Sequence, residues 1–268
     1  MASKGFVISR LPGFNPIAGL VFAGLYLPII ILVIYSFNAG RSVASWEGFS
    51  LQWYAVAWEN DAVKAATIRS LYLAASAAVI STFLATLAAL GTTRRKAFGG
   101  QTFIYVMINQ PLMVPEIVSA VALLIFFAMI KQATGYAGMG YLIAAHSAFC
   151  IPFAYLPIRA RLEGMDTTLE TAAADLYAST WQAFRFVTLP LLLPGIFAGM
   201  MLAFVTSLDD VVITVFVKSA GQDTLPTYML GQIRRQVTAE INAISTVLLA
   251  LTVLLLTLFF VLTRKKDE

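Results

Sequence analysis

The chain has 268 residues, of which 59% are hydrophobic and 12% are charged, and its mean hydropathy is +0.81. About a quarter of the residues of a typical soluble domain are charged, so this composition excludes an ordinary soluble protein and indicates one embedded in a membrane. A single cysteine excludes an internal disulfide, and one cysteine with one histidine supplies no zinc site of the usual kind.

Six apolar stretches reach the roughly 17 to 25 residues that a membrane-spanning helix requires. They are residues 17–37, 65–90, 103–130, 141–158, 189–208 and 241–263. The first exceeds the apolar region of a signal peptide, which is about 7 to 15 residues, and lacks a convincing cleavage site, so we interpret it as an uncleaved anchor. We expect an all-α integral membrane protein with one transmembrane domain over residues 1–268.

Lys and Arg concentrate at the two termini and on alternate loops, at Lys4, Arg10, Arg94, Arg95, Lys96, Arg159, Arg161, Arg185, Arg264, Lys265 and Lys266. Such residues favour the cytoplasmic side, so both termini and residues 159–190 are predicted to be cytoplasmic. The sequence pI near 9.2 thus reflects topology, because the basic residues mark helix ends and form no single patch for nucleic acid.

Acidic residues occur deep in two spans. Glu116 follows Pro111 and Pro115, which predict a kink, and at about 1.5 Å per residue it would lie some 20 Å along the third span. Asp209 and Asp210 end the fifth span. Buried acids are costly and usually face a cavity or partner, so we predict a cation pathway lined by these three. The alternative is a structural role, including a pair with Arg69.

His146 lies on an apolar helix, where it serves either as a proton relay or, more commonly, as hydrogen-bonded packing. No other histidine occurs in the chain to extend a relay.

The polar segment 159–190 predicts two short helices between the fourth and fifth spans. Asp166 or Thr167 is placed to cap the first, and Thr167 with Glu170 has the spacing of a capping box. Ala172 to Ala174 give that helix a smooth face, Ser179 is placed to cap the second helix, and Pro190 to open the next span. A smooth helical pair outside the membrane is typical of a docking surface.

This segment resembles the EAA loop of ABC importer permeases, in which Glu-Ala-Ala is followed after three residues by Gly and later by Leu-Pro. Thr171 stands at the place of the Glu, with Glu170 one residue early, and Tyr177 at the place of the Gly. The resemblance implies that an ATPase docks on Glu170, Thr171, Ala172, Ala173, Asp175, Tyr177 and Ala178.

Further motifs are similar to those of the spermidine/putrescine permease family, and to its second permease type. They are YSFNAG from Tyr35, the tryptophan-rich run from Trp46 to Tyr54, the proline segment ending at Ile117, the run from His146 to Phe153, SLDDVVI from Ser207, TLP at Thr224 and EINA at Glu240.

The family implies a type I ABC importer fold and a multi-pass subunit of the bacterial inner membrane that moves polyamines. Its implied partners are a second homologous permease, two ATPase subunits and a periplasmic polyamine-binding protein. ATP and Mg would be bound by the ATPase, because this chain has no G-x-x-x-x-G-K-[ST] motif and is not expected to be an enzyme. Two alternatives remain: an ABC permease for an opine, amino acid derivative or iron complex, and a cation-coupled secondary transporter.

Overall fold

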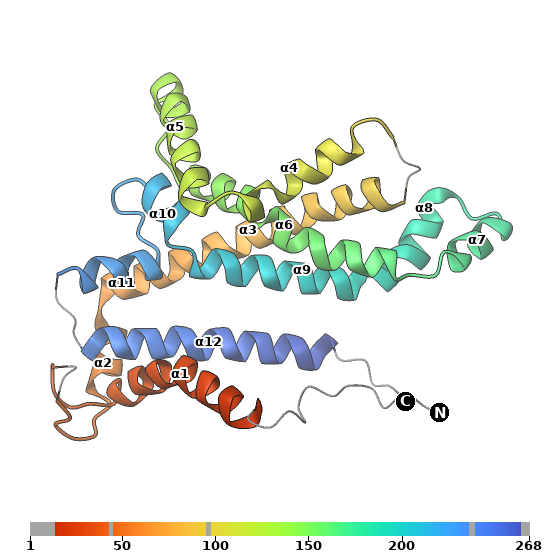
Figure 1. Cartoon of the computed structure of the whole chain (residues 1–268). Coiled ribbons are helices and arrows are strands. Elements are labelled where there is room, and N and C mark those ends of the chain that lie inside the picture. The colour runs from red at the N-terminus through yellow and green to blue at the C-terminus, as the bar shows by residue number, and fades with distance from the viewer. Residues whose placement is uncertain (1–13, 43–44, 95–97, 236–238, 264–268) are drawn as a thin grey trace. The chain divides into compact units, whose positions relative to one another are not determined.

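The computed structural model describes residues 14–42, 45–94, 98–235 and 239–263 (Figure 1). Among these residues there are helices and loops, and no strand beyond one bridge between Asn38 and Phe49. In chain order the helices are α1 (Phe14–Tyr35), α2 (Gln52–Glu59), α3 (Asp61–Thr93), α4 (Gln101–Met113), α5 (Glu116–Thr134), α6 (Gly140–Glu163), α7 (Thr168–Asp175), α8 (Thr180–Ala183), the π-helical turn η2 (Phe184–Thr188), α9 (Leu189–Asp209), α10 (Val212–Val217), α11 (Leu225–Ile233) and α12 (Ala239–Thr263).

Six of the described helices are long and apolar enough to cross a membrane, which confirms the predicted all-α class and number of spans. They are Asn15–Tyr35, Asp61–Thr93, Glu116–Thr134, Gly140–Glu163, Thr180–Asp209 and Ala239–Leu258. Several basic residues behind the predicted orientation, at both termini and at Arg95 and Lys96, lie outside the described residues. The sidedness of the membrane therefore stays a prediction.

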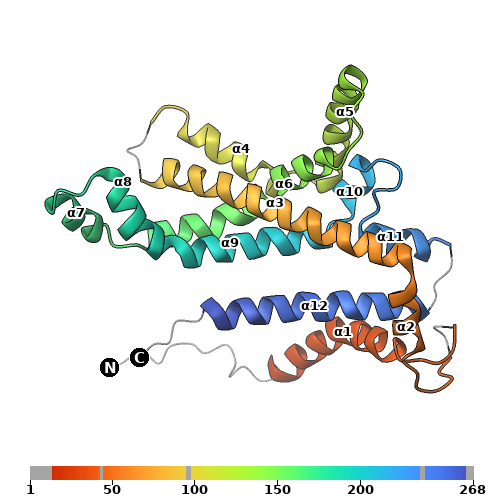
Figure 2. The same ribbon diagram turned by 180° about the vertical axis from the view of Figure 1, so that it is seen from behind.

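The third span was predicted as one kinked helix over residues 103–130, and this is wrong. α4 ends at Met113, Val114 is extended with φ −98° and ψ 136°, and α5 begins at Glu116. Pro115 disfavours a helical conformation at the residue before it, so the helix stops there instead of bending. Figures 1 and 2 show α4 and α5 leaving this break in different directions. Glu116 thus stands in the first turn of a helix, and the predicted depth along a continuous helix does not apply.

The described residues belong to two compact units. One consists of Met1–Asp61 with Gly231–Leu251, and the other of Ala62–Leu230 with Thr252–Glu268. Helix α12 contributes residues to both, and the single domain expected over residues 1–268 stays a prediction.

The first unit contains a loop built around the buried side chain of Asn38. Its Nδ2 donates to the carbonyl oxygens of Ser42 and Ser45, and its Oδ1 accepts from the backbone N–H groups of Gly40 and Glu47. The indole N–H of Trp53 donates to the carbonyl oxygen of Asn38 at 2.9 Å. Two family motifs, YSFNAG and the tryptophan-rich run, therefore hold one loop in shape.

The second unit is centred on the close packing of α6 against α9, which lie side by side in Figures 1 and 2. α9 places Gly195, Gly199 and Ala203 at four-residue spacing, on one face of the helix. A Cβ at Gly199 would stand 2.6 Å from the carbonyl oxygen of Ala154 in α6. The two backbones therefore meet where a side chain has no room, as small residues allow in membrane helix pairs.

Two buried clusters complete this unit. One joins α3 to the α6–α9 pair, and its largest side chains include Tyr155, Ile158, Leu162 and Leu192. The other gathers residues of α3, α5, α6 and α10, including Leu73, Leu142 and Ile213. The second cluster holds the short helix α10 in place directly after the end of α9. The α6–α9 pair thus has the α7–α8 segment at one end and α10 at the other (Figures 1 and 2).

Candidate substrate pathway and docking segment

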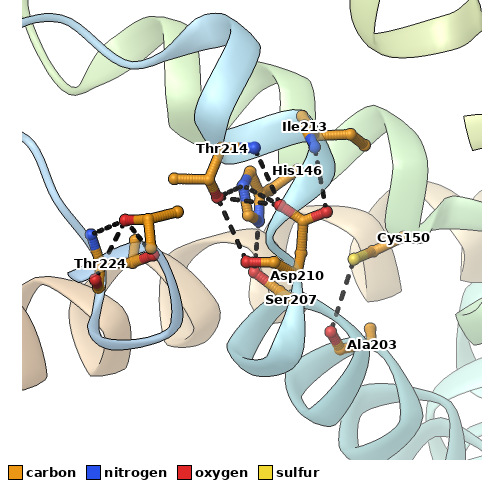
Figure 3. Close-up of polar contacts among 9 residues, drawn as sticks. His146, Cys150, Ala203, Ser207, Asp210, Ile213, Thr214 and Thr224 are labelled. Carbon is orange, nitrogen blue, oxygen red and sulfur yellow. Dashed lines mark hydrogen bonds and ion pairs between the residues drawn. The ribbon is translucent and has the colours of Figure 1, made fainter. Parts of the chain in front are cut away.

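Asp210 links the end of α9 to the start of α10. The residue is extended, with φ −65° and ψ 132°, and ends α9. Its Oδ1 accepts from the N–H of Ile213 at 3.2 Å, and its Oδ2 accepts from the N–H and the hydroxyl of Thr214 at 2.9 and 2.8 Å (Figure 3). A carboxylate here satisfies first-turn donors of α10 that have no partner within the helix. Asp210 is therefore a structural cap at the start of α10.

His146 of α6 completes the buried polar cluster around Asp210 (Figure 3). Its Nδ1 lies 2.8 Å from Ser207 Oγ, and its Nε2 lies 3.0 Å from Thr214 Oγ1 and 3.3 Å from Asp210 Oδ2. The Thr214 hydroxyl gives its proton to Asp210, so it accepts from Nε2–H of the imidazole. Between the two sequence hypotheses for His146, the contacts support hydrogen-bonded packing.

The three predicted pathway acids have different surroundings. Glu116 is half-buried at the start of α5, and its carboxyl group is close enough to Asp210 for the two to interact. Asp209 is exposed, and Asp210 is buried. Glu116 and Asp210 are brought together, whereas Asp209 keeps a solvent-accessible or lipid-accessible side chain one residue away. Ser207 and Thr214 belong to the same cluster, and the SLDDVVI motif contains Ser207 and ends one residue before Thr214.

Among the described residues, the hydrogen bond of Arg69 goes to a backbone carbonyl and not to one of the pathway acids. Its NH1 donates to the backbone carbonyl of Asp223 at 2.6 Å. The Asp223 carboxylate forms an ion pair with Lys218, and the next residue but one, Leu225, donates its N–H to Ser70 Oγ at 2.7 Å. Thr224 hydrogen-bonds to Thr227 and so fixes the start of α11 (Figure 3). The TLP motif is thus an anchor for this loop on α3.

The polar segment 159–190 contains both predicted short helices, with caps that differ in part from the prediction. The Asp166 carboxylate accepts the N–H of Thr168 at 2.9 Å, whereas Thr167 makes no side-chain cap. The same hydrogen bond lowers the pKa of Asp166 below its ordinary value. The capping box expected at Thr167 and Glu170 instead forms at Ser179 and Gln182, at the start of α8. Pro190 lies in the first turn of α9 as expected.

Glu170 points away from that expected box. Its Oε1 accepts a hydrogen bond from the Thr188 hydroxyl at 2.9 Å and lies 3.4 Å from NH2 of Arg94. This contact could not be predicted from local sequence, because Arg94 and Glu170 are far apart in the chain.

Tyr177 connects α7 to α8 with φ +59°, the one non-glycine residue with a positive φ in the described part of the chain. The ABC permease pattern has Gly at this place, and Gly adopts this backbone conformation without the steric cost that a Cβ brings. The Tyr177 side chain is 97% exposed, and Leu176 and Trp181 beside it are 81% and 66% exposed. The bend between the two helices therefore presents an apolar surface that the described residues leave largely uncovered.

A metal centre is not indicated by the described residues, which contain no group of three or more His, Cys, Asp or Glu side chains suited to hold an ion.

Comparison with known proteins assigns this architecture to a family. The profile described as binding-protein-dependent transport system inner membrane component matches residues 81–265. The putrescine transport system permease protein PotI of Escherichia coli K12 is 38% identical over 245 residues, which cover 90% of this chain and 87% of PotI. The spermidine/putrescine transport system permease protein PotC of Haemophilus influenzae is 38% identical over 254 residues, covering 95% of this chain and 97% of PotC.

A solved structure shares the fold. A bacterial ABC transporter involved in the import of the acidic polysaccharide alginate matches with a TM-score of 0.74, and the match covers 94% of each chain. The identity is 14%, so this likeness concerns the fold alone.

Proposed function

Because the chain belongs to the family of binding-protein-dependent transport system inner membrane components, we propose that it is a permease subunit of an ABC importer for polyamines. The observation that carries the substrate class is the 38% identity, along nine-tenths or more of the chain, to permeases named for putrescine and for spermidine/putrescine. The six apolar helices place the subunit in a membrane as a multi-pass protein, which we assign to the bacterial inner membrane.

The substrate pathway is proposed to include Glu116, Asp209 and Asp210. A polyamine carries several ammonium groups, and an unpaired ammonium in an apolar region is too costly to pass. Glu116 and Asp209 have accessible carboxyl groups that replace part of the water around each ammonium. Asp210 is held by backbone and side-chain donors, so it contributes a carboxyl group of fixed position close to Glu116. Partial neutralisation by a few carboxylates allows both binding and release.

The energy for transport is proposed to come from two separate ATPase subunits that bind ATP and Mg. One of them docks on the surface formed by Thr171, Ala172, Ala173, Asp175, Tyr177 and Ala178, with Leu176 and Trp181 beside it. Glu170, which the family resemblance also implied, is left out of this surface because its carboxylate faces Thr188 and Arg94 of its own chain. A second homologous permease completes the membrane part, and a periplasmic polyamine-binding protein delivers the substrate. Closure of the ATPase pair moves the α7–α8 segment, which continues through η2 into α9. A switch of this kind requires two alternative packings of the spans.

The test is ATPase stimulation in the purified complex of this chain with its second permease and ATPase. Each measurement uses binding protein loaded with putrescine, spermidine, an opine, an amino acid derivative or an iron complex. The proposal predicts stimulation by the polyamine-loaded protein. If only another solute stimulates the ATPase, the chain is still an importer permease but its substrate is not a polyamine. Substrate uptake by this chain alone, without an ATPase, would indicate a cation-coupled secondary transporter instead.

A further inference from the structure

Helix α7 has no buried residue of its own to hold it against the membrane-spanning helices. Two side-chain hydrogen bonds near its start are local: Thr168 N–H to Asp166, and the Thr171 hydroxyl to the Thr167 carbonyl. Among the described residues, the hydrogen bonds and ion pairs that leave α7 for other helices all involve the Glu170 side chain. The polar contacts that orient α7 against the other helices therefore converge on one carboxylate.

That carboxylate contacts two different elements through the same oxygen. Oε1 accepts from the hydroxyl of Thr188, which is 5% exposed and lies at the junction of η2 and α9. The same atom lies 3.4 Å from NH2 of Arg94, which directly follows the end of α3. Glu170 thus joins the docking helix to the starts or ends of two membrane-spanning helices.

The end of α3 is itself bound to two further helices. The Thr92 hydroxyl lies 2.9 Å from the hydroxyl of the fully buried Tyr155 in α6, and the Thr92 carbonyl accepts from Gln101 of α4 at 2.7 Å. A displacement of Glu170 that moves Arg94 acts on a helix end already fixed to α4 and α6. The contacts of Glu170 and of the end of α3 therefore link α7 to α3, α4, α6 and α9.

Arg94 depends on Glu170 electrostatically. Its Nε and NH2 atoms are buried and make no hydrogen bond, so the Glu170 carboxylate is the counter-charge that the structure provides for this guanidinium. Removal of one member of a poorly solvated ion pair leaves the other uncompensated and costs more than the pair contributes. A change at either residue should therefore disturb the junction, and a change that exchanges both charges should disturb it less.

We infer, on the basis of the proposed function, that Glu170 is a positioning residue that holds α7 to Thr188 and Arg94. Through these contacts it transmits the movement of the ATPase subunits to the spanning helices. In this role Glu170 faces its own chain and does not bind the ATPase. Loss of the contact leaves docking intact and lets α7 move without α3 and α9.

The test compares ATP hydrolysed with polyamine transported, using the full complex in proteoliposomes with loaded binding protein. Glu170→Gln keeps an acceptor for Thr188 and deletes the charge, Arg94→Gln deletes the opposite charge, and Thr188→Val removes the hydroxyl donor at similar size. We expect copurification of the ATPase and basal hydrolysis to be unchanged, and transport per ATP to fall by at least about fivefold, the lower end of typical coupling between sites. The double variant Arg94→Glu with Glu170→Arg is expected to recover part of that loss.

The matched control is Glu163→Gln, which deletes the same kind of charge from an exposed pair with Arg159 and is expected to leave transport per ATP unchanged. The inference is wrong if Glu170→Gln behaves like this control. It is also wrong if Glu170→Gln releases the ATPase, because the carboxylate would then be a docking contact. An unmodified complex that shows no stimulation by loaded binding protein would instead contradict the proposed function, whatever the variants do.

Discussion

The imidazole of His146 on α6 and the carboxylate of Asp210 after α9 lie 3.3 Å apart, and both side chains are almost fully buried. Together with Ser207 and Thr214 they connect α6, the end of α9 and the start of α10. Glu116 is close enough to Asp210 to interact with it, so this junction sets the position of one proposed pathway acid beside another.

Replacement of His146 tests the structural role of this cluster. His146→Leu fills a similar volume and removes both hydrogen bonds, which leaves the buried Ser207 hydroxyl without its partner. We expect a loss of about 1 to 3 kcal/mol in stability, the cost of an unsatisfied buried polar group. The measurement is the thermal unfolding of the detergent-solubilised complex. Unchanged unfolding combined with a changed pH profile of uptake would instead support the proton-relay alternative.

Substitutions that delete the charge and keep the size distinguish the roles of the three pathway acids. Glu116→Gln and Asp209→Asn should assemble normally, because neither residue caps a helix through its side chain. Polyamine uptake by both variants should fall, because the ammonium groups lose counter-charges in a region of low dielectric. Asp210→Asn should also reduce the yield of folded complex, since one of its two accepting oxygens becomes a donor group facing Thr214 or Ile213.

Uptake is measured in cells with equal membrane levels of each variant, and polyamine binding to the separate periplasmic protein serves as the control. Parental uptake in both Glu116→Gln and Asp209→Asn would assign these acids a structural role and leave the cationic substrate resting on family relationship alone.

Some parts of this structure follow from local sequence and were predictable. The six spans follow from hydrophobic length, and the start of α8 follows from a Ser179 cap that needs only neighbouring residues. The position of Pro190 in the first turn of α9 is likewise local. In each case the physical cause lies within a few residues of the effect.

Other parts depend on contacts between distant segments. The break at Pro115 could be read as a kink or an end, because proline occurs at both, and the extended backbone of Val114 shows that the helix ends there. The Glu170 half of the expected capping box is missing because its carboxylate is bound by Thr188 and Arg94, which is a tertiary contact. The His146 cluster unites residues about 60 apart in the chain, so composition and spacing gave no sign of its partners.

The contact between Gly199 and Ala154 gives a prediction about packing of α6 and α9. Gly199→Ala places a Cβ 2.6 Å from a backbone oxygen, so the two helices must separate, and overpacking of this kind costs about 1 to 3 kcal/mol. The control is Gly91→Ala near the end of α3, where a new Cβ meets nothing within 4 Å. Ala is the better helix former by up to about 1 kcal/mol, so the control should be neutral or stabilising. Thermal unfolding of both variants is the measurement, and equal stability would contradict the close approach.

The excess of Lys and Arg on alternate loops gives a prediction about topology. A reporter inserted near Phe98 or Thr180 should be cytoplasmic, and one near Gly138 or Gln222 should be external. The measurement is the activity of two reporters at each position, one active only in the cytoplasm and the other only in the periplasm. Periplasmic activity at Thr180 would remove the α7–α8 segment from the side where ATP is hydrolysed, and with it the proposed docking.

Variants at and near the exposed bend at Tyr177 distinguish a role in docking from a role in backbone geometry. Ala172→Arg adds a long charged side chain to the exposed face of α7, and at a close-packed contact it should cost about 1 to 3 kcal/mol and release the ATPase. Tyr177→Gly removes the Cβ from a left-handed residue and should stabilise the bend by about 1 to 2 kcal/mol. Any weakening of ATPase binding in Tyr177→Gly therefore reports the lost aromatic contact, because the helix pair itself is not disrupted. The measurement is the amount of ATPase that copurifies with each variant, together with uptake. Normal copurification and normal uptake in Ala172→Arg would mean that this face of α7 does not contact the ATPase.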